Sequence, residues 1–277
     1  FLLTENLANQ LKNRLGQTND LVIVSLENEA SIGDYYRVTN EVIELYNRPD
    51  RIEYQRVAGG NSLVTKSKDG ENLTMVNQLT SGELIRAVEI ASLPGWLATV
   101  VCHDFEDLAP KAIGWVKKNR QITKIVGRSF SRPKKLMSLK GAVAKFLHVP
   151  YRRGGKSKKT GFDCSSFVQV IFYLTQGIWL PRRASWQALL GQKVSSLKKV
   201  TVGDLAFFTL RQPAEVGHVG IVMENGPKQK IILAHCDEYS GGVAISSFDQ
   251  VLEKLPAGEY PSAFLMTLPK ALVRSRF

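Results

Sequence analysis

The chain has few cysteines and no long apolar run, and these shortages exclude several classes of protein. Its 277 residues include three cysteines at wide spacing, so we expect neither a CxxC zinc pair nor a disulfide framework. No apolar run approaches the roughly 18 residues of a membrane-spanning helix. There is also no internal repeat. With 44% hydrophobic and 22% charged residues, the chain is typical of a globular protein of about two domains.

Acidic residues are missing from one long segment. Residues 111–160 contain sixteen Lys or Arg and no Asp or Glu, which leaves 21 basic and 25 acidic residues elsewhere. This segment therefore carries the whole net charge of +12. A basic stretch without counter-charges favours a polyanionic partner, and the alternative is a solvated linker and helix face. No nucleic-acid-binding motif accompanies the charge, so we expect no nucleic acid as partner.

Hydrophobic patterning divides the chain into regions of different structure. We expect a helical or extended segment over 1–33, with a helix at 4–16 and a strand at 21–24. Short strand-like runs separated by Gly, Pro, Asn and Asp over 34–123 predict a small barrel or sandwich. A basic linker is expected over 124–136.

Residues 137–277 carry a different pattern, in which helices precede strands. One helix is expected from about 138 to 147, with Ser138 as its N-cap. A second is expected from Cys164 to about Thr175, ended by Gly177. Strands are expected from Leu205 onward. This order predicts an α+β domain with an antiparallel sheet.

The stretch GFDCSS, at residues 161–166, places Cys164 at the start of the second helix. Unpaired backbone N–H groups and the helix dipole favour a thiolate there, which predicts a lowered pKa. A nucleophilic cysteine also needs a base and a group that orients the base. The alternative is a buried structural thiol, because cysteine is among the most buried residue types.

Two of the four histidines are related by a predicted hairpin. The sequence Asn-Gly-Pro-Lys at 225–228 is typical of a turn between two strands. A symmetric hairpin would place His218 directly opposite His235, so that one ring could hold the other. A one-residue slip would send the rings to opposite faces of the sheet. His103 and His148 are expected to be ordinary polar residues.

Several motifs of the second half resemble those of NlpC/P60 cysteine peptidases, in the same order. The nucleophile motif is the first of them, and Cys164 lies within it. The matching segments are Pro150-Tyr151, Gly154-Gly155, 161–167, 180–187, 202–208, 217–222 and 234–243.

The resemblance implies a papain-like fold and a cysteine endopeptidase that cleaves the γ-D-glutamyl–diamino acid bond of murein peptides. By matching position, Cys164 is the nucleophile, His218 the base and His235 the orienting residue of a Cys-His-His triad. The Cys164 backbone N–H is an expected oxyanion donor. No metal or cofactor is expected. The alternatives are an amidase or acyltransferase on the same triad, and a non-catalytic wall-binding module.

The same resemblance suggests substrate contacts, at Tyr151, Asp163, Ser165, Arg183 and Ser185. Tyr151 matches the family's active-site tyrosine, and Asp163 is also expected to cap the helix. Arg183 stands where relatives that select a free N-terminal alanine commonly have Asp, so it favours a more acidic or blocked peptide.

The first half, over 34–123, resembles a bacterial SH3-like domain with an insertion. The resemblances favour a secreted or wall-associated bacterial protein, and the alternative is a cytoplasmic one that recycles murein peptides. In the wall-associated setting, the basic segment 111–160 is expected to meet anionic wall polymer.

Overall fold

The computed structural model of this chain describes most of its second half and the strands of its first half. The described residues are 33–39, 42–46, 53–55, 64–66, 72–73, 75–89, 95–105, 108–109, 111–210, 216–227, 230–255 and 262–268. The helix expected at 4–16 and the strand expected at 21–24 lie outside them. The chain divides into two compact units: Phe1–Cys102 with Ile113–Phe130, and His103–Ala112 with Ser131–Phe277.

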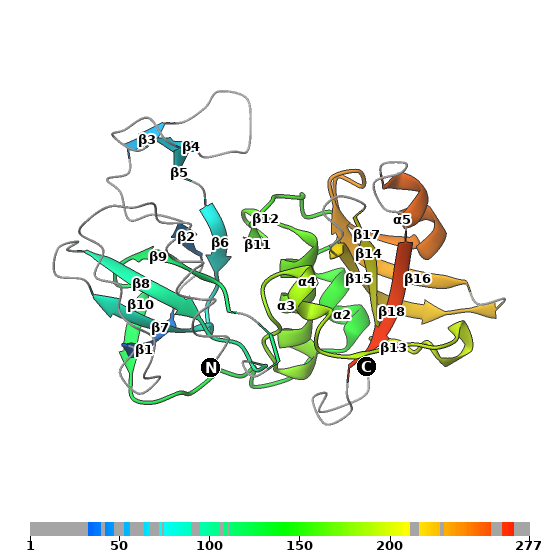
Figure 1. Cartoon of the computed structure of the whole chain (residues 1–277), viewed down its shortest axis with the longest axis horizontal. Coiled ribbons are helices and arrows are strands. Elements are labelled where there is room, and N and C mark those ends of the chain that lie inside the picture. Colours follow the sequence, from blue (N-terminus) through cyan, green and yellow to red (C-terminus); the bar gives the residue numbers. More distant parts are fainter. Residues whose placement is uncertain are drawn as a thin grey trace. The chain divides into compact units, whose positions relative to one another are not determined.

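The first unit contains a seven-stranded antiparallel sheet in the order β10-β1-β7-β8-β9-β2-β6 (Figure 1). Apolar side chains such as Leu45, Leu84 and Leu97 are completely buried in it. Its strands are β1 (Asp34–Val38), β2 (Ile43–Tyr46), β6 (Met75–Leu79), β7 (Leu84–Glu89), β8 (Trp96–Val101), β9 (Ile113–Lys117) and β10 (Ile122–Ile125). A separate three-stranded sheet contains β3 (Glu53–Gln55), β4 (Val64–Lys66) and β5 (Asn72–Leu73).

Strand β10 was not expected from the sequence, because it crosses the start of the expected linker at residue 124. It pairs with β1 in antiparallel register, with Tyr36 opposite Lys124. Lys124 also forms an exposed ion pair with Asp34. The exposed Thr123 and Lys124 stand between the partly buried Ile122 and Ile125, so this segment lacks the alternation typical of a strand.

Residues 103–112 belong to the second unit, although the sequence pattern placed them in the first domain. Phe105 and Ala109 are buried in the main core of the second unit. Asp104 accepts hydrogen bonds from Arg132 and from the backbone N–H of Trp179. The second unit therefore includes ten residues of the expected SH3-like range.

The second unit is built on a six-stranded antiparallel sheet in the order β13-β18-β14-β15-β16-β17. Its strands are β13 (Gln192–Lys193), β14 (Leu205–Thr209), β15 (Val216–Asn225), β16 (Ile231–Asp237), β17 (Gly242–Ser247) and β18 (Ser262–Thr267). The helices are α2 (Leu139–Ala144), α3 (Cys164–Gln176), α4 (Ala184–Gln187), α5 (Phe248–Lys254) and the 3₁₀ turn η2 (Leu197–Lys199). A short hairpin joins β11 (Lys156–Ser157) to β12 (Gly161–Phe162).

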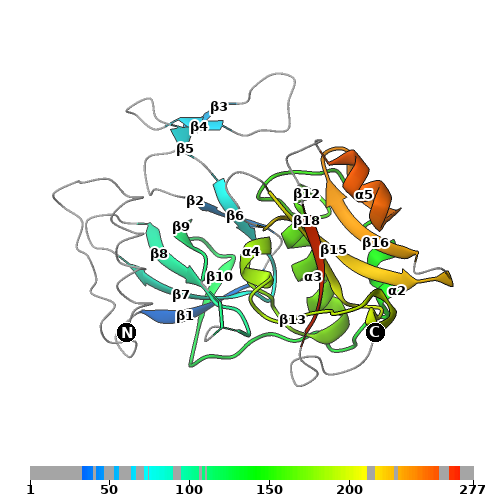
Figure 2. The same cartoon turned by 45° about the vertical axis from the view of Figure 1, so that its right-hand side comes forward.

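Helices cover both faces of this sheet, as Figure 2 shows for α3 and α5. On one face, Phe167 and Ile171 of α3 share a core with Val219 of β15. On the other face, Val251 of α5 packs in a second cluster with Phe208 of β14. The expected α+β order of helices before strands is confirmed, with α5 as an addition.

Three predicted helix signals are present in the second unit. Ser138 caps α2, and Asp163 caps α3 in a reciprocal capping box with Ser166. Gly177 ends α3 in the left-handed conformation at φ 69°. Helix α2 ends at Ala144, three residues before the expected end, because the chain tightens into a turn with Phe146 N–H bonded to the Val143 carbonyl.

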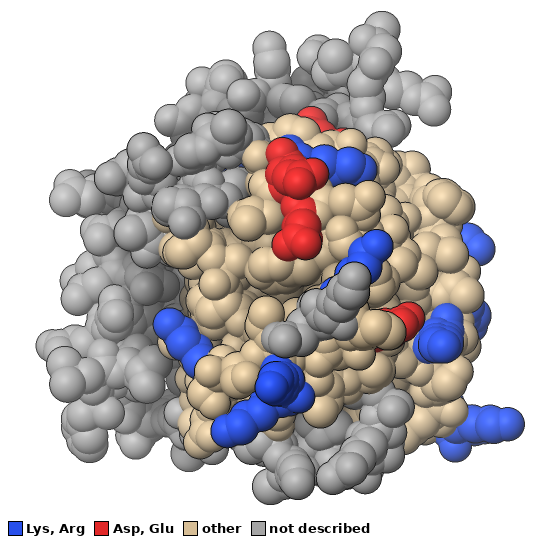
Figure 3. Space-filling view, turned by 90° about the vertical axis from the view of Figure 1, so that its right-hand side faces the viewer, with Lys and Arg blue, Asp and Glu red and all other residues tan. Residues whose placement is uncertain are grey.

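The basic run 111–160 does not form one separate segment. Parts of it are β9 and β10 of the first unit, and other parts are α2 and β11 of the second. Lys118 pairs with Glu89, Arg132 pairs with Asp104, and Lys156 is buried. On the face in Figure 3, Lys and Arg side chains are dispersed among neutral ones. Within the described residues, no helix is both long and apolar enough to cross a bilayer.

Candidate active site

The first turn of α3 is fixed by hydrogen bonds around Asp163. Its Oδ1 accepts from the Ser166 N–H at 2.8 Å, and its Oδ2 accepts from the Gly154 N–H at 2.9 Å. The Ser166 hydroxyl accepts from the Asp163 N–H at 3.0 Å. Cys164 is the first residue of this helix, so its own backbone N–H has no partner within the helix.

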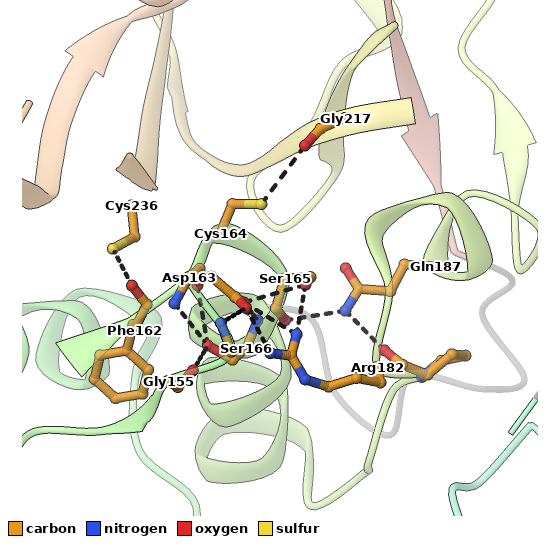
Figure 4. A network of polar contacts seen from close by, with 12 residues as sticks. Gly155, Phe162, Asp163, Cys164, Ser165, Ser166, Arg182, Gln187, Gly217 and Cys236 are labelled. Atoms are coloured by element: carbon orange, nitrogen blue, oxygen red, sulfur yellow. Dashed lines mark hydrogen bonds and ion pairs between the residues drawn. The ribbon is translucent and has the colours of Figure 1, made fainter. Parts of the chain in front are cut away.

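Arg182 forms a buried ion pair with this capping aspartate (Figure 4). Its two terminal nitrogens lie 3.0 Å from Oδ1 and 2.5 Å from Oδ2 of Asp163, and one of them also donates to the Ser165 hydroxyl at 2.9 Å. Burial acts to raise the pKa of Asp163, but the charge and hydrogen bonds of Arg182 outweigh it and lower that pKa. The sequence placed Arg182 in a motif without assigning it a role.

Gln187 of α4 connects the same network to the next segment. Its amide nitrogen donates to the Ser165 carbonyl at 3.0 Å and to the Pro181 carbonyl at 2.9 Å. The start of α3 is thus connected to α4 on two sides, by Arg182 and by Gln187. Asp163 and Ser165 are both buried within this network, so their contact with substrate stays a prediction.

Cys164 lies where β15 and β16 separate. The pairing of these strands reaches Gly220 opposite His235 and is not continued to the residues of β15 before Gly220. At that opening, the Cys164 Sγ lies 4.0 Å from the Gly217 carbonyl oxygen, as Figure 4 shows. The structure therefore brings the cysteine of α3 next to the residue that precedes His218.

The expected low pKa of Cys164 is wrong for this structure. Burial of the thiol raises its pKa to about 12, and the Asp163 carboxylate adds to the increase. The backbone N–H of Val219 and the Arg182 charge act in the opposite direction but do not compensate. The helix N-terminus is therefore not enough to make a thiolate, because burial and, after it, the Asp163 carboxylate at the cap outweigh it.

The direct pairing of His218 with His235 is also wrong, although the two rings meet. Next to the turn, Asn225 pairs with Ile231, whereas the symmetric hairpin would pair it with residue 228, three positions earlier. An odd offset would place the rings on opposite faces. A one-residue bulge at Met223 reduces the offset to two, and the rings share a face with centroids 5.6 Å apart.

Asp237 contacts His235 and lies near His218, and the sequence did not predict its place there. Its Oδ2 lies 2.7 Å from His235 Nδ1, while His235 Nε2 lies 3.2 Å from the Ser246 hydroxyl. Burial acts to raise the pKa of Asp237, but the His235 ring and the Ser240 N–H bring it down to about 2. Two residues after His235 on a strand is the same face, which is the signal that could have identified Asp237.

His218 is buried between aromatic rings. Its ring centroid lies 5.5 Å from that of Phe208, and its Nε2 is buried without a hydrogen-bond partner among the described residues. Burial and the neighbouring His235 lower its pKa to about 3, so the ring is neutral at physiological pH. The described contacts include no hydrogen bond between His218 and Cys164.

The remaining predicted site residues lie in the same unit. Tyr151 is partly buried, and burial raises the pKa of its phenol, with a smaller contribution from the nearby Cys164. Arg183 is exposed, and its guanidinium stacks over the Trp186 ring at 5.6 Å. Ser185 is partly buried in α4. The nearby polar groups of this region thus come from α3, α4, β15 and β16.

The other cysteines and histidines have surroundings unlike those of Cys164. Cys102 and Cys236 are buried, no disulfide joins the three cysteines, and the Cys236 thiol donates to the Phe162 carbonyl at 3.3 Å. His103 is buried and accepts from the Phe105 N–H at 3.1 Å. His148 is exposed on a turn.

The comparisons with known proteins give one family and several relatives that match part of this chain. The family described as "NlpC/P60 family" matches residues 148–252. A gamma-DL-glutamyl hydrolase of Bacillus subtilis (strain 168) is 39% identical over 77 residues, which are 28% of this chain and 18% of the relative. The bifunctional muramidase/DL-endopeptidase CwlT of the same organism is 43% identical over 83 residues, or 30% and 25% of the two chains.

A third relative is the murein DD-endopeptidase MepS/murein LD-carboxypeptidase of Escherichia coli (strain K12). It is 39% identical over 102 residues, which are 37% of this chain and 49% of the relative. The matches thus span from about a fifth to a half of the length of these three relatives. The family match over residues 148–252 includes Cys164 and the two histidines, and this part of the chain is similar to the NlpC/P60 family.

Proposed function

We propose that the chain is a cysteine endopeptidase that hydrolyses peptide bonds of peptidoglycan, with Cys164 as nucleophile. The observation that carries the proposal is the position of Cys164 at the capped start of α3, against the strand residue that precedes His218. The family match and the peptidase names of the relatives support a peptidase.

In this proposal, His218 acts as general base towards a protonated thiol. A thiol with a pKa of about 12 and a neutral imidazole both carry the right protons at neutral pH for a base-assisted attack. His218 takes the proton while the sulfur attacks the carbonyl carbon, and the same ring then protonates the leaving amine. Water releases the thioester. Catalytic hydrogen bonds are often formed only with substrate present, so Cys164 and His218 would meet in that complex.

His235 and Asp237 orient the base. The Asp237 carboxylate stays ionised and contacts His235 Nδ1, while Ser246 contacts the other nitrogen. This arrangement holds the His235 ring against that of His218. The Cys164 N–H is placed to stabilise the oxyanion, because it opens the helix.

The scissile bond we propose is that between γ-D-glutamate and a diamino acid. Two relatives are named as DL-endopeptidase or gamma-DL-glutamyl hydrolase, whereas the third is named as a DD-endopeptidase and LD-carboxypeptidase. An amidase or acyltransferase would use the same residues on another bond. Arg183 and Tyr151 are proposed substrate contacts, since Arg183 is exposed and Tyr151 packs, partly buried, against the same core as Cys164.

A non-catalytic wall-binding module is the second candidate. It is favoured by the raised pKa of Cys164 and by the missing hydrogen bond to His218. Iodoacetamide at neutral pH separates the two, because an inert module should show no alkylation of Cys164 while a peptidase should be alkylated there.

The remaining features fit a wall-associated enzyme. We propose that the first unit is an SH3-like domain, and that exposed basic residues of 111–160 meet anionic wall polymer. Binding through these charges should weaken steeply with added salt. A secreted or wall-associated location is part of the same proposal.

Mass spectrometry of products tests the activity. The substrates are L-Ala-γ-D-Glu-L-Lys, its diaminopimelate counterpart and N-blocked versions of both. Wild type should release the diamino acid, Cys164→Ala should not, and Cys102→Ala should match wild type. Cleavage that survives in Cys164→Ala would reject the cysteine mechanism. Absence of cleavage of every peptide would favour the binding module.

A further inference from the structure

The two histidines and Asp237 form a compact cluster of metal-ligand atoms. One such atom from each of His218, His235 and Asp237 lies within 4.8 Å of the other two. All three side chains are buried and come from neighbouring strands, β15 and β16, so their positions are fixed by the sheet. We propose that this cluster binds one Zn²⁺ ion and that the bound metal inhibits the peptidase.

The His218 side chain supports a ligand at this place. Its Nε2 is buried, and among the described residues nothing satisfies it by a hydrogen bond. A buried polar atom without a partner carries a desolvation cost, which a bound cation would remove. His218 belongs to the same cluster as the His235–Asp237 contact.

The hydroxyl beside His235 supplies the second requirement of a metal site. Metal-binding imidazoles usually donate their other ring N–H to an oxygen, which fixes the tautomer. With His235 Nδ1 on the metal, Nε2 carries the proton and donates to the Ser246 hydroxyl, 3.2 Å away. The local hydrogen bonding therefore suits a metal on the Asp237 side of the ring.

Ligand type and spacing favour zinc. Two imidazoles and a carboxylate leave a fourth position for water, which is the ligand set of many open zinc sites. Zn–N and Zn–O bonds of about 2.0–2.2 Å require ligand atoms roughly 3.3 Å apart. The observed spacings run from 2.7 Å to at most 4.8 Å, so shifts on the order of 1 Å would close the site.

Inhibition follows if His218 is the base, and this part depends on the proposed function. A metal ion on Nε2 occupies the lone pair of that nitrogen, and the ring then loses its freedom to turn towards Cys164. Binding itself does not depend on catalysis, so the two can be measured separately.

The binding test uses the full chain with Cys164→Ala, freed of metal by a chelator and titrated with Zn²⁺ against a chromogenic chelator. We expect one ion per chain, and a visible absorption band typical of tetrahedral coordination when Co²⁺ replaces Zn²⁺. In this background, Asp237→Asn and His218→Gln should each weaken binding more than tenfold. The exposed His148→Asn is the matched control and should bind as tightly as its parent.

Loss of the site in Cys164→Ala itself, or equal affinity in Asp237→Asn and His148→Asn, would overturn the proposed ligand set. Circular dichroism checks that each variant is folded. If His218→Gln does not fold, the zinc affinity of Asp237→Asn alone decides the outcome. In wild type, Zn²⁺ should abolish peptide cleavage and a chelator should restore it. Binding without inhibition of an active enzyme would reject the inhibitory role, while an enzyme inactive even without metal would count against the proposed function alone.

Discussion

Replacing Arg182 with methionine should destabilise the second unit strongly. Both partners of the Arg182–Asp163 pair are about one-tenth exposed or less, with side-chain exposures of 8% and 11%. Removing one partner of a buried pair costs about 3–5 kcal/mol, because the remaining charge is stranded. The Gly154 and Ser166 N–H groups still stabilise the carboxylate, so we expect the lower part of that range.

The measurement is hydrogen–deuterium exchange in increasing urea, resolved by peptide, since the two units need not unfold together. Peptides from α3 should lose about 3 kcal/mol of protection in Arg182→Met. Arg183→Met is the matched control, because its side chain is exposed, and should change little. Adding Asp163→Asn to Arg182→Met should restore part of the loss, because it removes the stranded charge. Equal protection in Arg182→Met and Arg183→Met would refute this reasoning.

Four further changes have defined outcomes. Cys164→Ala should abolish peptide cleavage while leaving the urea midpoint of unfolding within error, and residual cleavage above about 1% of wild type would contradict its role as nucleophile. Asp237→Asn should lower kcat about tenfold or more with little change in KM, because His235 loses the carboxylate that orients it; a change in KM alone would argue against positioning. Gly242→Ala should cost more than about 1 kcal/mol, measured by the same exchange experiment, because φ is +150° and a Cβ would lie 2.1 Å from a backbone oxygen. The pKa of Asp163 is lowered in the folded state, so the stability that its carboxylate contributes is complete above the unfolded pKa of about 3.9 and is lost as pH falls towards the folded pKa. Between pH 6 and 3, the Asp163→Asn variant should therefore lose less stability than wild type. Parallel curves of unfolding free energy against pH for the two proteins would disprove this.

Local signals in the sequence were sufficient for the start of α3. The capping residue Asp163, the first helical residue Cys164 and the terminating Gly177 all depend on contacts within the helix and its next neighbours. Strand positions such as β7 and β15 were also predictable, because apolar periodicity is a local property. Residues 103–112 could not be assigned in this way, since Phe105 is buried against a core formed much later in the chain.

The electrostatics of the site were not predictable from the chain order. The helix N-terminus suggested a lowered pKa for Cys164, but burial and the Asp163 carboxylate raise it. Arg182 lies nineteen positions from Asp163, so only the folded chain shows that the pair is formed and buried. The neutral state of His218 likewise depends on the ring of His235 and on burial.

The sequence by itself determined where the candidate residues lie: a cysteine opening a helix and two histidines on one hairpin. These follow from residue type and from periodicity within a few positions. The tertiary structure decided the register that brings His218 and His235 to one face, through the combined offset of a longer turn and a bulge at Met223. It also decided that Asp237 joins them, because contacts across strands depend on how many residues each turn and bulge uses.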